Sequence, residues 1–167
     1  MGYHEHKHKS PVSVTCAVII ISGSRTEQND ESGKLITQAL ENNDHKVTSF
    51  SILKNDADSI LKKLDQLLEE ESLQVIITSG GTGASHLDIT IETITPTLDK
   101  KLDGFGELFR FLTYQEIGTG SIMSRAMAGV VGGKVVICLP GSVEAVRLAM
   151  EKIILPEIGH LVREATR

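Results

Sequence analysis

Three short segments rich in glycine and hydroxyl side chains each follow directly on an apolar run. They read Ser22-Gly23-Ser24-Arg25, Ser79-Gly80-Gly81-Thr82-Gly83 and Pro140-Gly141-Ser142. Glycines there let backbone N–H groups approach an anion, and the N-terminus of a following helix adds partial positive charge. Glycines can equally form tight turns, and for Gly141 alone both interpretations stay open. In the second segment, three glycines within four residues, followed by a hydroxyl group and an acid, favour phosphate binding.

Two aspartates stand where they could hold a divalent cation beside such phosphates. Asp88 comes five residues after Gly83, and Asp56 follows the apolar run 46–53. Mg²⁺ is usually bound by one or two carboxylates together with substrate phosphates. Each aspartate could instead cap the helix that follows it, and the two roles are compatible because a cap fixes the position of the carboxylate. We therefore predict Asp88 and Asp56 as metal ligands and catalytic residues.

Several standard catalytic and nucleotide-binding motifs are absent. The first apolar run is followed by SGSRTE rather than the dinucleotide fingerprint G-x-G-x-x-G, and Gly83 is followed by Ala84-Ser85 rather than the Lys of a Walker A loop. The nucleophile elbow G-x-S-x-G does not occur either. Ser85, His86 and Asp88 have the residue types of a hydrolytic triad, but neighbours on one loop rarely converge as a triad does.

The composition is that of one globular domain. The chain has 167 residues, of which 40% are hydrophobic and 23% charged, and its net charge of −5 argues against a nucleic-acid partner. No apolar run is long enough for a membrane span, and the first residues lack the apolar region of a signal peptide, so we expect a cytoplasmic protein. Cys16 and Cys138 lie in apolar runs and are predicted to be reduced, buried thiols.

Residues 1–11 are predicted to form a flexible leader, and residues 12–167 the single domain. The leader carries His4, His6 and His8 at alternate positions. Imidazole is a common metal ligand, so this string could bind a metal. The alternative is a charged leader with no fixed geometry.

Alternating apolar runs and amphipathic stretches predict the elements that position these segments. The runs 14–22, 46–53, 73–79 and 134–139 are typical of strands buried on both faces. Helices are expected after Asp30 or Ser32, after Asn55 or Asp56, through 106–114, around 122–130 and after Ser142, with a break at Pro156 before a last helix. This order predicts an α/β fold, a three-layer α/β/α sandwich with a mostly parallel sheet and ligands at the carboxyl ends of its strands.

The run ITSGGTGASHLDITIETI, residues 77–94, resembles the signature T-x-G-G-T-G-x-x-x-x-D-x-T of the molybdenum cofactor biosynthesis MoaB/MogA family. The stretches GFGELFRFLTYQEIGTGSIMSRAMAGV and LPGSVEAVR continue the resemblance, which covers about residues 12–165. The pattern Y-x-E-I-G through S-R-A and the short C-terminus are more similar to the MoaB branch than to the longer MogA branch.

This resemblance implies a homotrimer or homohexamer that binds molybdopterin. It also implies a reaction in which the terminal phosphate of molybdopterin attacks the α-phosphate of Mg-ATP and pyrophosphate leaves. The adenylylated product would pass to a downstream protein that inserts molybdenum. Two alternatives stay open, a non-catalytic molybdopterin-binding or carrier protein of the same pathway and a generic nucleotide-binding regulatory module.

The resemblance also assigns site residues by position. Backbone groups of Gly80–Gly83 would bind nucleotide phosphates, Ser142 the pterin phosphate, and Asp88 with Asp56 would hold Mg²⁺. Arg125 would contact a phosphate or the pterin, or form a surface or intersubunit salt bridge. The full predicted set of ligand-binding positions is Ser79, Gly80, Gly81, Thr82, Gly83, Ser124, Arg125, Pro140, Gly141 and Ser142. One departure is that this chain has Lys54-Asn55-Asp56 where the adenylylating branch commonly has Pro-Asp.

Overall fold

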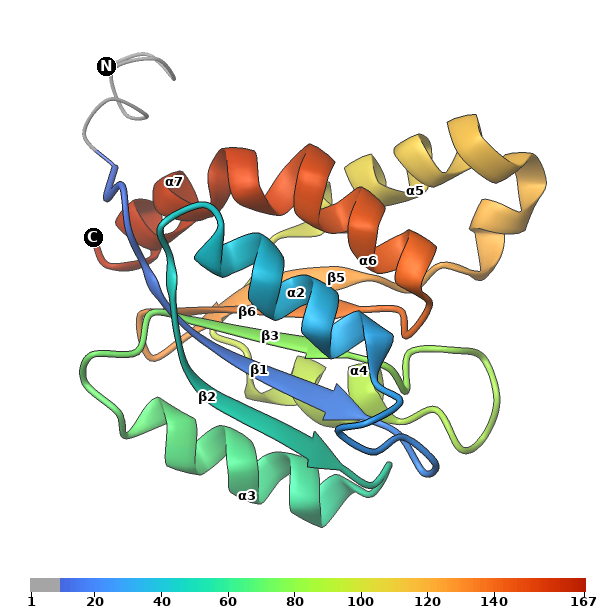
Figure 1. The fold of residues 1–167 in the computed structure, drawn as a ribbon, viewed down its shortest axis with the longest axis horizontal. Helices are drawn as coiled ribbons and strands as arrows, with labels where there is room; N and C mark the ends of the chain where they lie inside the picture. The colour runs from blue at the N-terminus through green and yellow to red at the C-terminus, as the bar shows by residue number, and fades with distance from the viewer. Residues whose placement is uncertain (1–9) are drawn as a thin grey trace.

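The computed structural model describes residues 10–167, which form one six-stranded sheet in the order β2-β1-β3-β6-β5-β4 (Figure 1). His4, His6 and His8 of the predicted leader lie outside the described residues. The strands are β1 Thr15–Ile21, β2 Lys46–Leu53, β3 Val75–Ser79, β4 Lys100–Lys101, β5 Met127–Val131 and β6 Lys134–Leu139. The pairs β2–β1, β1–β3 and β3–β6 are parallel, whereas β5 is antiparallel to both β6 and β4. The predicted mostly parallel sheet is confirmed.

Helices cover both faces of the sheet and make it the middle of three layers (Figure 1). One face carries α2 (Glu31–Glu41), α5 (Asp103–Ile117), α6 (Val143–Ala149) and α7 (Leu155–Ala165), and the other carries α3 (Ala57–Leu68) and α4 (Thr90–Ile94). The short helices are η1 Thr95–Thr97, η2 Gly118–Met123 and the π-helical η3 Met150–Ile154. Successive side chains of a strand face opposite sides, so Val18 joins the core under α2 and Ile19 the core under α3.

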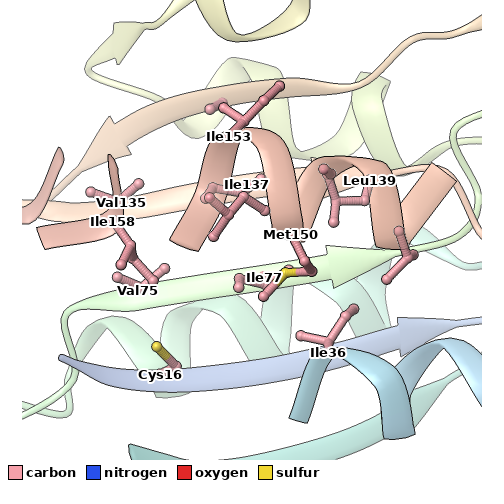
Figure 2. Packing of buried hydrophobic residues seen from close by; sticks show 14 of the residues in the cluster. Cys16, Ile36, Val75, Ile77, Val135, Ile137, Leu139, Met150, Ile153 and Ile158 are labelled. Carbon is pink, nitrogen blue, oxygen red and sulfur yellow. The ribbon is translucent and has the colours of Figure 1, made fainter. Parts of the chain in front are cut away.

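Mostly branched apolar side chains fill the layer between the sheet and the helices α2, η3 and α7 (Figure 2). β3 and β6 contribute the centre of this core, and the helices close over it with Ile36, Met150, Ile153 and Ile158. Burying one such side chain contributes about 1.5–3 kcal/mol. The continuous apolar runs in the sequence are therefore explained by helices on both faces of each parallel strand.

Both cysteines are free and buried, as predicted. Cys16 lies in β1 and Cys138 in β6, on opposite faces of the sheet. Burial raises the pKa of each thiol to about 12, because a thiolate would be desolvated in the core. Neither thiol is suited to nucleophilic chemistry at neutral pH.

Three predicted capping residues begin helices at the end of the sheet where β1, β3 and β6 finish. The side chains of Asp30, Asp56 and Ser142 accept hydrogen bonds from backbone N–H groups three residues later, at the starts of α2, α3 and α6. Each cap satisfies a backbone donor that the first turn of a helix leaves unpaired. The caps fix where the turns after the strands end.

The helix predicted around 122–130 is wrong. Residues 118–123 form the 3₁₀ helix η2, and residues 127–131 form strand β5, which pairs with β6. Gly132 and Gly133 have φ angles of 56° and 76° and make the tight turn between β5 and β6. Positive φ at both turn residues matches the twist of an antiparallel hairpin. Pairing with a neighbouring strand thus overrides the local helical pattern.

The break predicted at Pro156 is also wrong, although the last helix is confirmed. The helical path continues from α6 through the π-helical η3 into α7, and Pro156 lies in the first turn of α7. A proline is tolerated there because the widened π turn changes the hydrogen-bond partners just before it. Within residues 10–167, no helix is both long and apolar enough to span a membrane.

Candidate functional site

The carboxyl ends of β1, β3 and β6 stand level at one edge of the sheet. Ile20 pairs with Ser79, and Ser79 pairs with Leu139. The order of strands reverses beside β1, because β2 lies on one side of it and β3 on the other. Ligands of parallel α/β sheets bind at such a reversal. A cavity of about 670 Å³ opens there, and we call it the first cavity.

Most of the predicted site residues line the first cavity. Those in the lining are Gly80, Gly81, Thr82, Gly83, Asp88, Ser124, Pro140, Gly141 and Ser142. Ser79, Asp56 and Arg125 lie outside the lining. Ser79 is buried at the end of β3, and its hydroxyl group donates a hydrogen bond of 3.1 Å to the carbonyl oxygen of Pro140. It therefore ties two of the lining segments together.

The turn after β3 has a backbone that only glycine can adopt without strain. Gly80 and Gly81 have φ angles of 104° and 63°, and a Cβ atom on Gly80 would overlap the carbonyl oxygen of Ile21. Thr90 holds this turn to α4, since its hydroxyl group donates to Gly80 O at 2.9 Å and its N–H to Gly81 O at 2.9 Å. The turn is thus a fixed part of the cavity wall.

Asp88 brings a carboxylate to the cavity from the loop that follows this turn. Its Oδ2 accepts a hydrogen bond of 3.2 Å from Ser85 N, and its carboxylate lies against Gly83, where a Cβ atom would come within 2.6 Å of Oδ2. Helix α4 begins two residues later with no side-chain cap. Asp88 therefore does not serve as the helix cap that the sequence allowed, and its carboxylate belongs to the cavity.

The helix-capping role and the ligand-site position that were both expected of Asp56 belong to two neighbouring residues, Asp56 and Asn55. Asp56 Oδ1 accepts a hydrogen bond of 2.9 Å from Ser59 N, which lowers the pKa of this carboxyl group and fixes it at the start of α3. Asn55 lines the cavity instead, and its Nδ2 donates to the carbonyl oxygen of Leu87. The Oδ1 atom of Asn55 is buried and has no hydrogen-bond partner among the described residues. Asp88 and Asp56 are therefore not brought together in the lining.

Arg25 is a site residue to which sequence reasoning assigned no individual role. Its guanidinium group lies 3.3 Å from Asp30 Oδ1 and donates a hydrogen bond of 2.6 Å to Gly141 O. Asp30 is 1% exposed, so this ion pair is anchored in the protein interior. Among the described residues of the lining, Arg25 is the sole cation and Asp88 the sole anion. The sequence signal that could have indicated this role is an arginine followed five residues later by an aspartate that caps a helix.

Arg125 lies beside the cavity wall rather than in it. Its guanidinium group donates a hydrogen bond of 3.1 Å to Gly83 O and forms an ion pair with Glu92. The hydrogen bond from Arg125 lowers the pKa of Glu92. The salt-bridge alternative for Arg125 is therefore realised within the chain. Its neighbour Ser124 does line the cavity, with a buried hydroxyl oxygen that has no partner among the described residues.

An apolar wall, which the sequence analysis did not predict, completes the first cavity. Phe109, Thr113 and Ile117 lie one helical turn apart on α5, and Met123 of η2 adjoins them. Their spacing of four residues is the signal that could have found them. The cavity thus joins hydrogen-bonding loops to a surface suited to a flat organic ring.

Comparisons with known proteins agree with this geometry. Residues 17–160 match the family described as "Probable molybdopterin binding domain". The chain is 46% identical to molybdenum cofactor biosynthesis protein B of Bacillus cereus over 168 residues, covering 100% of this chain and 99% of that protein. A crystal structure of a molybdenum cofactor biosynthesis protein B superposes with a TM-score of 0.90 at 46% identity, covering 94% of this chain and 98% of the other.

A second solved structure extends the comparison. The tungsten cofactor synthesizing protein MoaB of Pyrococcus furiosus superposes with a TM-score of 0.86 at 36% identity, covering 95% of this chain and 100% of that one. The matches span nearly the whole chain, including all three segments of the first cavity. This chain therefore belongs to the MoaB/MogA family of molybdenum cofactor biosynthesis proteins, which share a molybdopterin-binding domain.

Proposed function

We propose that the chain binds molybdopterin and ATP in the first cavity and transfers AMP to the terminal phosphate of molybdopterin. The observation that carries this proposal is the cavity itself, where a glycine-built turn, one arginine and one carboxylate meet an apolar wall. In the reaction, a phosphate oxygen of molybdopterin forms a bond to the α-phosphorus of ATP. The bond from that phosphorus to the bridging oxygen breaks, and pyrophosphate leaves with the electron pair.

Phosphoryl-type transfer needs positioning and charge neutralisation more than covalent help from the protein. The backbone of Gly80–Gly83 and the guanidinium group of Arg25 would bind phosphate oxygens, and Arg25 is already oriented by Asp30 and Gly141. The ring of the pterin would lie on the exposed apolar side chains of Ile117 and Met123, which pack over the buried core. Orientation by fixed groups lowers the entropic part of the barrier.

The residues at the rim of the first cavity fit a magnesium ion shared with phosphates. Asp88 offers a carboxylate, and the buried Oδ1 of Asn55 is an amide oxygen without a partner among the described residues. Both are the hard oxygen donors that Mg²⁺ prefers. Such an ion would neutralise negative charge on the phosphates. Asp56 lies outside this donor set, because its carboxylate caps α3.

A non-catalytic molybdopterin-binding or carrier protein is the second candidate function. The observation that favours it is that Asp88 alone supplies a carboxylate to the described lining, since Asp56 lies outside it. A carrier needs the phosphate-binding turn and the apolar wall but no metal site. It would bind molybdopterin and release it unchanged.

One assay separates the two functions. The purified protein is mixed with molybdopterin, ATP and Mg²⁺, and pyrophosphate and adenylylated molybdopterin are measured over time. The proposal predicts both products in equal amounts and none when ATP is omitted. Tight binding of molybdopterin without either product would select the carrier function.

We further propose that the chain forms a homotrimer or homohexamer and passes its product to a protein that inserts molybdenum or tungsten. Helix α5 and η2 support self-association, because Leu108, Phe111, Tyr114 and Ile122 are large apolar or aromatic side chains that lie exposed. Free buried thiols suit the reducing cytoplasm. Light scattering on the eluting protein would give its mass, and a monomer would contradict the assembly.

A further inference from the structure

A second cavity of about 290 Å³ adjoins the first cavity, and Ser124 lines both. Its lining contains three cationic residues from different elements, Lys101 of β4, Arg110 of α5 and Arg125 of the segment before β5. Asp103 is the sole acid among the described residues of this lining. The second cavity is therefore basic, although the whole chain has a net charge of −5.

Arg110 reaches this cavity because the helix beneath it carries a glycine. A Cβ atom on Gly106 would lie 2.7 Å from Ala126 O and 3.1 Å from a guanidinium nitrogen of Arg110. The glycine lets the guanidinium group lie down on α5 and lets residues 124–128 approach the helix. Within residues 10–167, the side chain of Arg110 takes part in no hydrogen bond or ion pair, so the N–H donors of its planar guanidinium group are available to a ligand.

Ser124 provides a second, independent sign of a site for a polar group. Its hydroxyl oxygen is buried and lacks a hydrogen-bond partner among the described residues. A buried polar atom without a partner is costly, and such atoms usually meet a ligand or an ordered water. Ser124 lies next to Arg125 and at the boundary of the two cavities.

Arg125 connects the second cavity to the phosphate-binding turn of the first. Arg125 lines the second cavity, and its guanidinium group donates a hydrogen bond to Gly83 O and pairs with Glu92. Glu92 is 55% exposed, so water weakens this ion pair, and an anion in the cavity could compete for the arginine. A movement of the Arg125 guanidinium group would then alter its hydrogen bond to Gly83 O.

We infer that the second cavity is a binding site for a small oxyanion of the phosphate class, of the size of phosphate or pyrophosphate. Arginine guanidinium groups match the geometry of phosphate oxygens. The volume lies at the lower end of ligand pockets, which suits a small anion better than a nucleotide. The anion can come from solution or be pyrophosphate released in the first cavity. Its occupancy would act on the turn at Gly83 through Arg125.

Nuclear magnetic resonance with pyrophosphate as the probe tests this site without molybdopterin or ATP. Pyrophosphate should shift the amide signals of Lys101, Ala126 and Ala128, with a dissociation constant distinct from that at Gly80–Gly83. Arg110→Gln should weaken binding at the second cavity by about 10-fold to 100-fold and leave the first cavity unchanged. Arg147→Gln, an exposed arginine of α6, is the matched control and should behave like the unchanged protein. Titration with phosphate shows whether one phosphate group suffices.

Three results would overturn the inference. The amides of the second cavity could stay unshifted while those of Gly80–Gly83 respond, or Arg147→Gln could cause the same loss as Arg110→Gln. Arg110→Gln could also change the mass of the assembly without any pyrophosphate-dependent shift, which would identify the cavity as a subunit contact. If Arg110→Gln fails to fold, Arg110→Lys replaces it in the test, because lysine keeps the positive charge but lacks the planar set of guanidinium N–H donors. Because the readout contains neither molybdopterin nor ATP, its failure leaves the proposed function standing.

Discussion

The turns after β2 and β3 each carry an aspartate, and the two aspartates end in different surroundings. Asp88, after β3, lies in the first cavity against Gly83, whereas Asp56, after β2, caps α3 and leaves the cavity position to Asn55. The two residues look equivalent in the sequence. Their difference shows that the direction of a turn, rather than the residue type, decides which carboxylate can meet a ligand.

Among substitutions in these turns, the replacement of Gly80 with alanine should have the largest effect on the stability of the protein. Gly80 has a φ angle of 104°, and a Cβ atom would overlap the carbonyl oxygen of Ile21. We expect the free energy of unfolding, measured with urea, to fall by about 3 kcal/mol or more. Gly23→Ala is the control, because no atom lies within 4 Å of its added Cβ. Its effect should stay within about 0.5 kcal/mol, and equal losses would show that the turn after β3 is not specially constrained.

Replacing Arg25 should weaken the binding of phosphate groups at the same edge of the sheet. We expect Arg25→Gln to reduce the affinity for ATP, measured by titration calorimetry, by about 10-fold to 100-fold. This change leaves the buried Asp30 without its cation, so the double variant Arg25→Gln/Asp30→Asn provides a better-folded comparison. The affinity loss should persist in the double variant. Recovery of ATP affinity there would mean that Arg25 acts only by neutralising Asp30.

Replacing Asp56 should have the smallest effect, confined to stability. Asp56→Ala removes the cap of α3 and is expected to lower Tm by a few degrees while leaving ATP affinity unchanged. The pKa of Asp56 is lowered in the folded protein from an ordinary value of 3.8, mainly by the hydrogen bond from Ser59 N. Its stabilisation is therefore present above that value and is lost as pH falls through the lower folded pKa. The Tm difference between the two proteins should shrink on acidification, and a growing difference would contradict the cap.

The parallel half of the sheet could be predicted from the sequence, but its antiparallel edge could not. β1, β3 and β6 are continuous apolar runs because both their faces are covered. β4 has two residues, and β5 reads Met-Ala-Gly-Val-Val, which carries no clear periodicity. Its strand conformation comes from pairing with β6 rather than from local preference.

The candidate site was predictable where its chemistry is local. Gly80 and Gly81 have positive φ angles, and the presence of glycine at both positions already indicates such a backbone in the sequence. The position of Arg25 depends on Gly141, which is 116 residues away along the chain. Whether Asn55 or Asp56 lines the cavity depends on the residue at which α3 begins. Helix boundaries are assigned from sequence only to within one or two residues, so this difference could not be predicted.

Single-turnover formation of adenylylated molybdopterin by Asp88→Asn and Asp56→Asn variants tests the central claim most directly. Asparagine keeps the shape of each side chain and can still cap a helix, so both variants should fold. We predict that Asp88→Asn abolishes AMP transfer, while Asp56→Asn keeps a rate within about threefold of the unchanged protein, a difference of less than about 1 kcal/mol in the barrier. A folded Asp88→Asn protein that still forms the product at the normal rate would contradict the assignment of this carboxylate.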